Sequence, residues 1–179
     1  MEKKRGFILW LTGLSGAGKS TLSQGIESVL KERGISVEVL DGDIVRTNLS
    51  QGLSFSKEDR DTNVYRVGFV ANLLSRNQVG VIVSLISPYR DVRNKLREIT
   101  TNFIEVYVNA SLEVCEARDV KGLYLKARSG EIKGFTGIDD PYEEPINPDI
   151  VCYTSVETIE ESIAKVIGFL TEQNYLTDE

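Results

Sequence analysis

The sequence predicts an α/β fold in which a five-stranded parallel sheet lies between two layers of helices. Short apolar segments alternate with helical segments along the whole chain, which is typical of a parallel sheet covered by helices on both faces. The length of 179 residues, with 41% hydrophobic and 27% charged residues, fits one globular domain of ordinary size. We therefore expect residues 1–179 to form a single three-layer domain.

Five short apolar runs predict the strands. The first, at 7–11, is apolar throughout, as expected of a strand that is buried on both faces. The other four runs lie at 37–40, 79–86, 103–108 and 149–153. The chain therefore supplies enough strands for one sheet.

Periodicity and capping residues predict the helices between these strands. Apolar residues recur at helical spacing over 20–33, and Gly34 then gives a stop signal. Ser56 is a suitable N-cap for a long helix that ends near Gln78. Three further helices are expected at 91–100, 112–118 and 156–172.

Residues 119–148 contain three of the four prolines and are predicted to form an irregular segment over a ligand, which we call the lid. Its first half carries four basic residues and two acidic ones, in a chain whose net charge is −6. A positive island in a negative chain suits an anionic ligand. The alternative is a solvated run of charges. The four basic residues are Lys121, Lys126, Arg128 and Lys133.

The composition argues against several classes of protein. A net charge of −6 disfavours general binding to nucleic acid, and no apolar run approaches the roughly 18 residues of a membrane span. The lack of histidine excludes Ser-His-Asp and Cys-His catalysis and histidine-ligated metals. Two cysteines, Cys115 and Cys152, are too few for a disulfide framework, so we expect a cytoplasmic protein.

The strongest motif is the glycine-rich segment Gly13-Leu-Ser-Gly-Ala-Gly-Lys-Ser20, which matches G-x-x-x-x-G-K-[ST] between a strand and a helix. Its glycines let backbone N–H groups surround a phosphate, Lys19 reaches the β- and γ-phosphates, and the Ser20 hydroxyl is a ligand for Mg²⁺. ATP and Mg²⁺ are therefore the expected cofactors. The predicted ATP-binding residues are Gly13, Leu14, Ser15, Gly16, Ala17, Gly18, Lys19, Ser20 and Thr21.

A phosphate-binding loop of this kind, a P-loop, does not separate a kinase from a switch protein. The D-x-x-G letters of a GTPase occur at 119–122, but they follow a predicted helix, and 94–97 lacks the aspartate of N-K-x-D. A GTPase is therefore disfavoured. An ATP-binding regulatory module remains open from the P-loop alone.

Two carboxylates follow the second predicted strand, in the segment Leu40-Asp-Gly-Asp43. Because ligands gather at the carboxyl ends of parallel strands, Asp41 and Asp43 suit metal positioning and proton removal from an acceptor hydroxyl. The alternative is a pair of helix-capping aspartates. The third strand ends without an acidic residue, and Ser87 and Arg90 follow it; these could also belong to a simple turn with Pro88.

Taken together, the motifs resemble the adenylylsulfate kinase (APS kinase) family. The resemblance covers about 6–148, and the lid sequence Lys133-Gly-Phe-Thr-Gly-Ile-Asp139 beside Ile86-Ser-Pro-Tyr-Arg90 is its most specific part. It implies transfer of the γ-phosphoryl of MgATP to the 3′-hydroxyl of adenosine 5′-phosphosulfate (APS), giving 3′-phosphoadenylylsulfate (PAPS) in sulfate assimilation. The matching segments are Gly13–Ser20, Leu40–Asp43, Phe55–Arg60, Ile86–Arg90, Phe103–Val106, Gly122–Tyr124 and Gly130–Tyr142.

The resemblance also implies roles for individual residues. Asp43 would orient or deprotonate the acceptor hydroxyl, while Phe55 and Phe135 would stack on its adenine. The implied catalytic residues are Ser87, Asp43 and Lys19. The implied APS-binding residues are Asp41, Asp43, Arg46, Phe55, Arg60, Asn63, Ile86, Ser87, Lys121, Leu123, Lys133 and Phe135. The basic residues of the lid would close over the phosphates.

Ser87 corresponds to the position described in the family as a phosphoserine intermediate. In-line transfer needs only positioning and charge stabilisation, and a serine without a neighbouring base is a poor nucleophile. Thr47 and Ser54 depart from the histidine and glycine usual in the family.

The expected protein is a homodimer that binds APS and ATP and neither nucleic acid nor membrane. Another small-molecule P-loop kinase and a silent APS- or PAPS-binding regulatory domain are the alternatives.

Overall fold

One sheet of five parallel strands forms the centre of the molecule, which the computed structural model describes over residues 5–176. The strand order is β2-β3-β1-β4-β5, and every neighbouring pair is parallel. This confirms the predicted sheet. The strands are β1 (Phe7–Thr12), β2 (Val37–Asp41), β3 (Gly80–Ser84), β4 (Phe103–Asn109) and β5 (Ile150–Tyr153).

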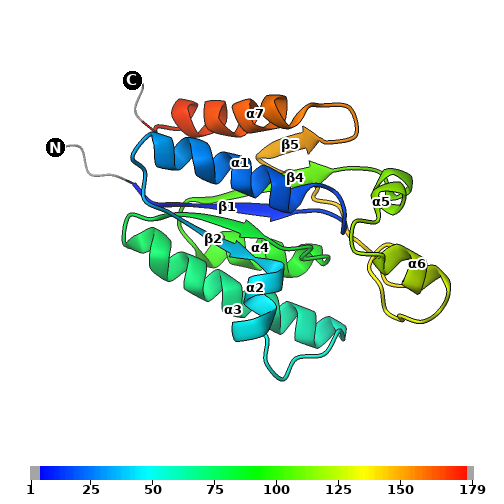
Figure 1. The fold of residues 1–179 in the computed structure, drawn as a ribbon. Coiled ribbons are helices and arrows are strands. Elements are labelled where there is room, and N and C mark those ends of the chain that lie inside the picture. Colours follow the sequence, from blue (N-terminus) through cyan, green and yellow to red (C-terminus); the bar gives the residue numbers. More distant parts are fainter. Residues whose placement is uncertain (1–4, 177–179) are drawn as a thin grey trace.

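Helices cover both faces of this sheet, as Figure 1 shows, with α1 and α7 on one side and α3 and α4 on the other. The side chains of β1 alternate between two apolar cores: Leu9 packs in the core under α1 and α7, and Trp10 packs in the core under α3 and α4. Burial on both faces explains the unbroken apolar run. The helices are α1 (Lys19–Glu32), α2 (Gly42–Asn48), α3 (Lys57–Arg76), α4 (Arg90–Ile99), α5 (Leu112–Arg118), α6 (Leu123–Arg128) and α7 (Ile159–Glu172).

The central position of β1 decides where a ligand can bind. Its neighbours are β3 on one side and β4 on the other, so the chain leaves β1 at the point where the strand order reverses. In open α/β sheets the crevice for ligands lies at this point, at the carboxyl ends of the strands. The P-loop follows β1 directly and therefore stands in that crevice.

The structure differs most clearly from the predicted elements in three places. The third strand ends at Ser84 instead of residue 86, and the last helix begins at Ile159, where Thr158 and Glu161 form a capping box. The lid is not wholly irregular, because α6 forms inside it. The Asp119 carboxylate accepts hydrogen bonds from the N–H groups of Tyr124 and Leu125, which stabilises this short helix.

The predicted N-cap of the long helix is confirmed: the Ser56 hydroxyl accepts a hydrogen bond from the N–H of Asp59 at the start of α3. Within residues 5–176, none of the helices is both long and apolar enough to cross a membrane.

Candidate active site

A cavity of about 770 Å³ opens at the carboxyl ends of the strands, bounded by the P-loop, α2, the start of α3 and the lid. Six of the nine predicted ATP-binding residues line it; Gly13, Leu14 and Ala17 do not. The predicted catalytic residues Ser87, Asp43 and Lys19 all line it. So do all the predicted acceptor-site residues, namely Asp41, Asp43, Arg46, Phe55, Arg60, Asn63, Ile86, Ser87, Lys121, Leu123, Lys133 and Phe135.

The P-loop has the backbone shape that a phosphate cradle requires. Gly16 and Gly18 have φ angles of 77° and 103°, in the left-handed region where a side chain would be strained. Lys19 is 9% exposed, and its Nζ donates to the carbonyl oxygens of Gly13 at 2.9 Å and Leu14 at 2.8 Å. Burial lowers the pKa of Lys19 to about 8, although the nearby Asp41 acts in the opposite direction. A phosphate next to this ammonium would raise its pKa again.

Three residues outside the P-loop hold the loop in place, and the sequence did not single them out as site residues. The Tyr124 hydroxyl donates to the Ser15 carbonyl at 2.8 Å, and the Thr154 hydroxyl donates to the Ala17 carbonyl at 2.6 Å. Arg118 donates to the Thr154 carbonyl at 2.6 Å and to the Gly16 carbonyl at 3.1 Å. Tyr124 belongs to the Gly122-Leu-Tyr motif, but nothing in that motif indicates a contact with the P-loop.

The two aspartates after β2 have different surroundings. Asp41 is the N-cap of α2, where one carboxylate oxygen accepts from the Asp43 N–H at 3.1 Å and the other accepts from the Ser20 hydroxyl at 2.8 Å. The Asp43 carboxylate is 71% exposed and faces Lys121 of the lid, whose Nζ lies 2.5 Å away. The capping alternative therefore applies to Asp41 alone, and Asp43 is left available for a ligand.

Oxygen donors suited to Mg²⁺ meet where the P-loop approaches β2. The Ser20 hydroxyl and an Asp41 carboxylate oxygen are in hydrogen-bond contact at 2.8 Å at the N-terminus of α1. Mg²⁺ prefers oxygen ligands and binds through one or two protein groups together with phosphates and water. These residues therefore fit the predicted metal, with Ser20 as ligand and Asp41 beside it.

Only part of the basic lid points into the cavity. Lys121 and Lys133 line it, whereas Lys126 and Arg128 do not. The Lys126 Nζ lies 3.6 Å from a carboxylate oxygen of Glu131, and the Arg128 Nε lies 2.6 Å from a carboxylate oxygen of Glu116. The prediction that all four basic residues close over the phosphates is therefore wrong for these two, because nearby carboxylates pair with them outside the cavity.

Arg60 connects α3 to the lid. Its guanidinium donates to the Thr136 hydroxyl at 2.5 Å and to the Gly134 carbonyl, and it lies 3.2 Å from the Asp140 carboxylate. Burial, and then the nearby Arg60, lower the pKa of Arg46. Two guanidinium groups side by side on a cavity wall favour an anionic ligand, which would reduce their repulsion.

The two aromatic residues predicted to stack on adenine lie in different environments. Phe55 is 57% exposed, and the Arg46 guanidinium lies 4.1 Å from the centre of its ring. Phe135 packs partly against the core and meets Tyr124 edge to face at 5.1 Å between ring centres. Phe135 therefore also has a packing role, because its ring contacts Tyr124 of α6.

Ser87 is 3% exposed and has a φ of 42°, an unusual conformation for a residue other than glycine. Its hydroxyl accepts from the Trp10 indole at 3.0 Å and donates to the Leu85 carbonyl at 3.4 Å. Neither partner is a base that would take its proton. The surroundings of Ser87 thus give its hydroxyl no activation as a nucleophile.

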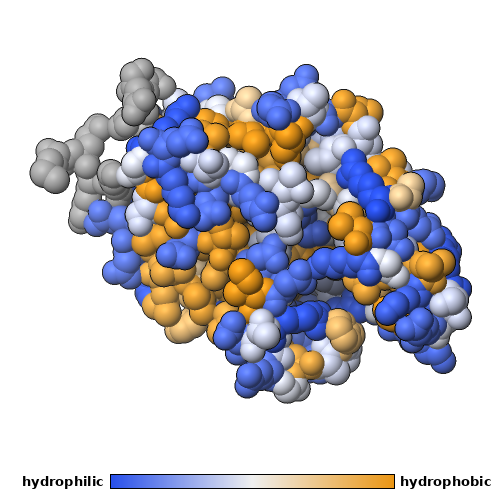
Figure 2. All heavy atoms as spheres, viewed as in Figure 1, coloured by the Kyte–Doolittle hydropathy of each residue, from blue (hydrophilic) through white to orange (hydrophobic). Residues whose placement is uncertain are grey.

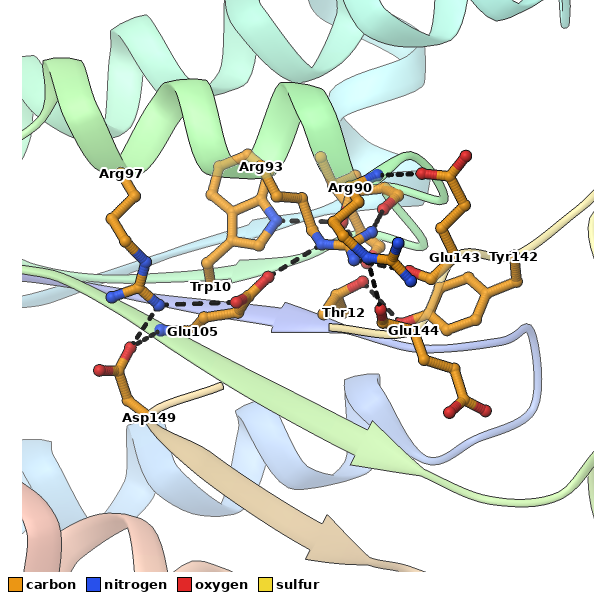
Figure 3. A network of polar contacts seen from close by, with 12 residues as sticks. Trp10, Thr12, Arg90, Arg93, Arg97, Glu105, Tyr142, Glu143, Glu144 and Asp149 are labelled. Carbon is orange, nitrogen blue, oxygen red and sulfur yellow. Dashed lines mark hydrogen bonds and ion pairs between the residues drawn. The ribbon is translucent and has the colours of Figure 1, made fainter. Parts of the chain in front are cut away.

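A buried network, drawn in Figure 3, holds this turn in position. Arg93 of α4 is 1% exposed and donates to the Glu105 carboxylate at 2.9 Å, to the Ser87 carbonyl at 2.6 Å and to the Glu143 carbonyl at 2.6 Å. Glu105 lies on β4, and its backbone N–H donates to Asp149 just before β5. One guanidinium therefore ties the turn after β3 to β4 and to the end of the lid.

A parallel five-stranded sheet, a P-loop with its lysine and serine, and a second set of charged groups across the same cavity define a P-loop kinase fold. The comparisons with known proteins identify which family it represents. The family model for adenylylsulphate kinase matches residues 5–153. The chain belongs to the adenylylsulphate kinase family.

Individual relatives agree with this membership. The adenylyl-sulfate kinase of Rippkaea orientalis is 64% identical over 174 residues, which cover 97% of this chain and 96% of that protein. The structure of the Mycobacterium tuberculosis APS kinase in complex with AMPPNP and APS matches with a TM-score of 0.90 and 44% identity, over 94% of this chain and 99% of that one. The structure of the hexameric APS kinase from Thiobacillus denitrificans matches at 35% identity with a TM-score of 0.74. The match covers 97% of this chain and 30% of the Thiobacillus denitrificans chain.

Proposed function

We propose that this chain is an adenylyl-sulfate kinase that acts as one kinase domain with a lid over about residues 119–148. It would transfer the γ-phosphoryl of MgATP to the 3′-hydroxyl of APS and release ADP and PAPS. The observation that carries the proposal is that six of the nine predicted ATP-binding residues and the whole predicted acceptor set line one cavity. In-line transfer requires donor and acceptor to share such a space.

We propose the following roles on the donor side. The P-loop N–H groups and Lys19 bind the phosphates of ATP. Mg²⁺, held by Ser20 and the phosphates next to Asp41, would neutralise charge on the transferring group. Tyr124, Arg118 and Thr154 keep the loop in shape through its carbonyl groups.

On the acceptor side, we propose that the exposed carboxylate of Asp43 orients the 3′-hydroxyl and accepts its proton once Lys121 has moved away. Arg46 and Arg60 would bind the phosphosulfate, with Asn63 and Lys133, which line the same cavity. Lys121 pairs with Asp43 and lies on the lid, so it is suited to move to a phosphate when substrates bind. Ser87 serves as a fixed part of the wall, since its hydroxyl is already engaged by Trp10.

ADP release with and without APS tests the proposal. We expect Mg²⁺-dependent ADP formation that requires APS, and at least about a hundredfold lower kcat in a folded Lys19→Ala variant, because that residue stabilises charge on the transferring group. A preference for a different acceptor would identify another small-molecule kinase. Nucleotide binding with no ADP formation would instead identify a regulatory domain.

We further propose that the chain works as a homodimer in the cytoplasm. Tyr65, Phe69 and Leu73 follow one another at four-residue spacing on α3 and are 37%, 65% and 37% exposed. Figure 2 shows apolar surface over this helix. A second copy would remove such a stripe from water. Light scattering at two protein concentrations tests the dimer, and a monomer at both would contradict it.

A further inference from the structure

Strand β3 ends in a buried hydroxyl that has no hydrogen-bond partner. Ser84 is 3% exposed, and its Oγ is one of four buried side-chain polar atoms without a partner among the described residues. A buried hydroxyl normally finds a partner, because losing its bond to water costs free energy. Ser84 also lines the active-site cavity, so a bound ligand can supply the missing partner.

The sheet register shows which face of β3 carries Ser84. Side chains of a strand alternate between faces, so Ser84 points to the same side as Ile82. Ile82 packs in the core that contains Leu22 and Ile26 of α1. Ser84 therefore faces the α1 side of the sheet, where the P-loop lysine and serine begin the helix.

The neighbour of Ser84 on the adjacent strand is Asp41. The two residues are paired in the parallel register of β2 and β3, which places both side chains on one face. Asp41 in turn contacts the Ser20 hydroxyl at 2.8 Å. Ser84 thus stands beside Asp41, which contacts the Ser20 hydroxyl that fits Mg²⁺ as a ligand.

We infer that Ser84 is a positioning residue for the magnesium ion that accompanies ATP, and that its hydroxyl accepts a hydrogen bond from a water ligand of that ion. Mg²⁺ keeps several water ligands in protein sites, and these waters need partners. Many P-loop proteins place an aspartate at this strand end, whereas this chain has a neutral hydroxyl there. The inference rests on the proposed function only in requiring that the chain binds MgATP.

The test compares Ser84→Ala with Ser75→Ala. Ser75 lies on α3, is 4% exposed and also has a hydroxyl without a partner, but it does not line the cavity. Binding of the ATP analogue AMPPNP is measured by calorimetry in excess Mg²⁺ and in excess EDTA. The ratio of the two affinities reports the contribution of the metal and is independent of turnover.

For Ser84→Ala we expect this ratio to fall about tenfold, the lower end of the effect of removing a group that supports a metal ligand. The thermal midpoint should stay the same or rise, because the change removes an unsatisfied polar atom. Ser75→Ala should raise or keep the midpoint and leave the ratio unchanged. A ratio for Ser84→Ala within twofold of the wild type would overturn the inference. If the wild type itself gains no affinity from Mg²⁺, the proposed function fails and this inference fails with it.

Discussion

Replacing Arg93 with methionine tests whether the buried network holds the acceptor side of the cavity in shape. The substitution keeps the length of the side chain and removes three donated hydrogen bonds, to the Glu105 carboxylate and to the carbonyls of Ser87 and Glu143. It also leaves Glu105, whose side chain is 5% exposed, without its buried partner.

The size of the effect follows from these contacts. Removing one member of a buried ion pair costs about 3–5 kcal/mol. Glu105 keeps a weaker contact with Arg97 at 3.5 Å, so we expect a loss near 3 kcal/mol, about the lower end of that range. For a chain of this length, 1 kcal/mol shifts the thermal midpoint by about 2–4 °C, so the midpoint should fall by about 6–12 °C.

Calorimetry and steady-state kinetics on the same preparation provide the measurement. The KM for APS should rise and the KM for ATP should change little, because the network touches the turn at Ser87 and the end of the lid but not the P-loop. The double variant Arg93→Met/Glu105→Gln should recover part of the midpoint, since no buried charge is left unpaired. A midpoint within 2 °C of the wild type, or equal changes in both KM values, would refute the reasoning.

Three further changes have definite expected outcomes. Nucleotide affinity should fall about tenfold per pH unit above pH 8, because the Lys19 ammonium that phosphate requires has a pKa of about 8 before binding. Calorimetry over pH 7–10 tests this, and a constant affinity would contradict it. Asp43→Asn should lower kcat at least about a hundredfold, because it removes the carboxylate that accepts the proton. ATP affinity and the thermal midpoint should change little, because the exposed ion pair of Asp43 contributes only about 0–1 kcal/mol. Lost ATP binding with kcat retained would show a structural role instead. Phe135→Ala should weaken APS binding by about 1–3 kcal/mol if the ring stacks on adenine. It should also lower the thermal midpoint, because the ring packs on Tyr124. A lower thermal midpoint with unchanged APS affinity would remove Phe135 from the site.

The sequence by itself determined the sheet, the P-loop and the family, because each is recognised from short continuous segments and their order along the chain. Alternating apolar and helical segments are local patterns, and the P-loop is a continuous run of residues whose glycines permit one backbone shape. Helix α6 was missed for a related reason. Prolines and glycines are spread through the lid, and its Leu123–Arg128 segment is too short to show a period.

Only the tertiary structure decided what individual site residues do. Sequence reasoning could not tell that Asp41 caps a helix while Asp43 faces Lys121, which is 78 positions further along the chain. Likewise, Tyr124 supports the P-loop at Ser15, 109 positions away, and Arg60 is occupied largely by the lid. Such partners are brought together by the packing of whole elements, and no local pattern of residues encodes which atoms then come within hydrogen-bond distance.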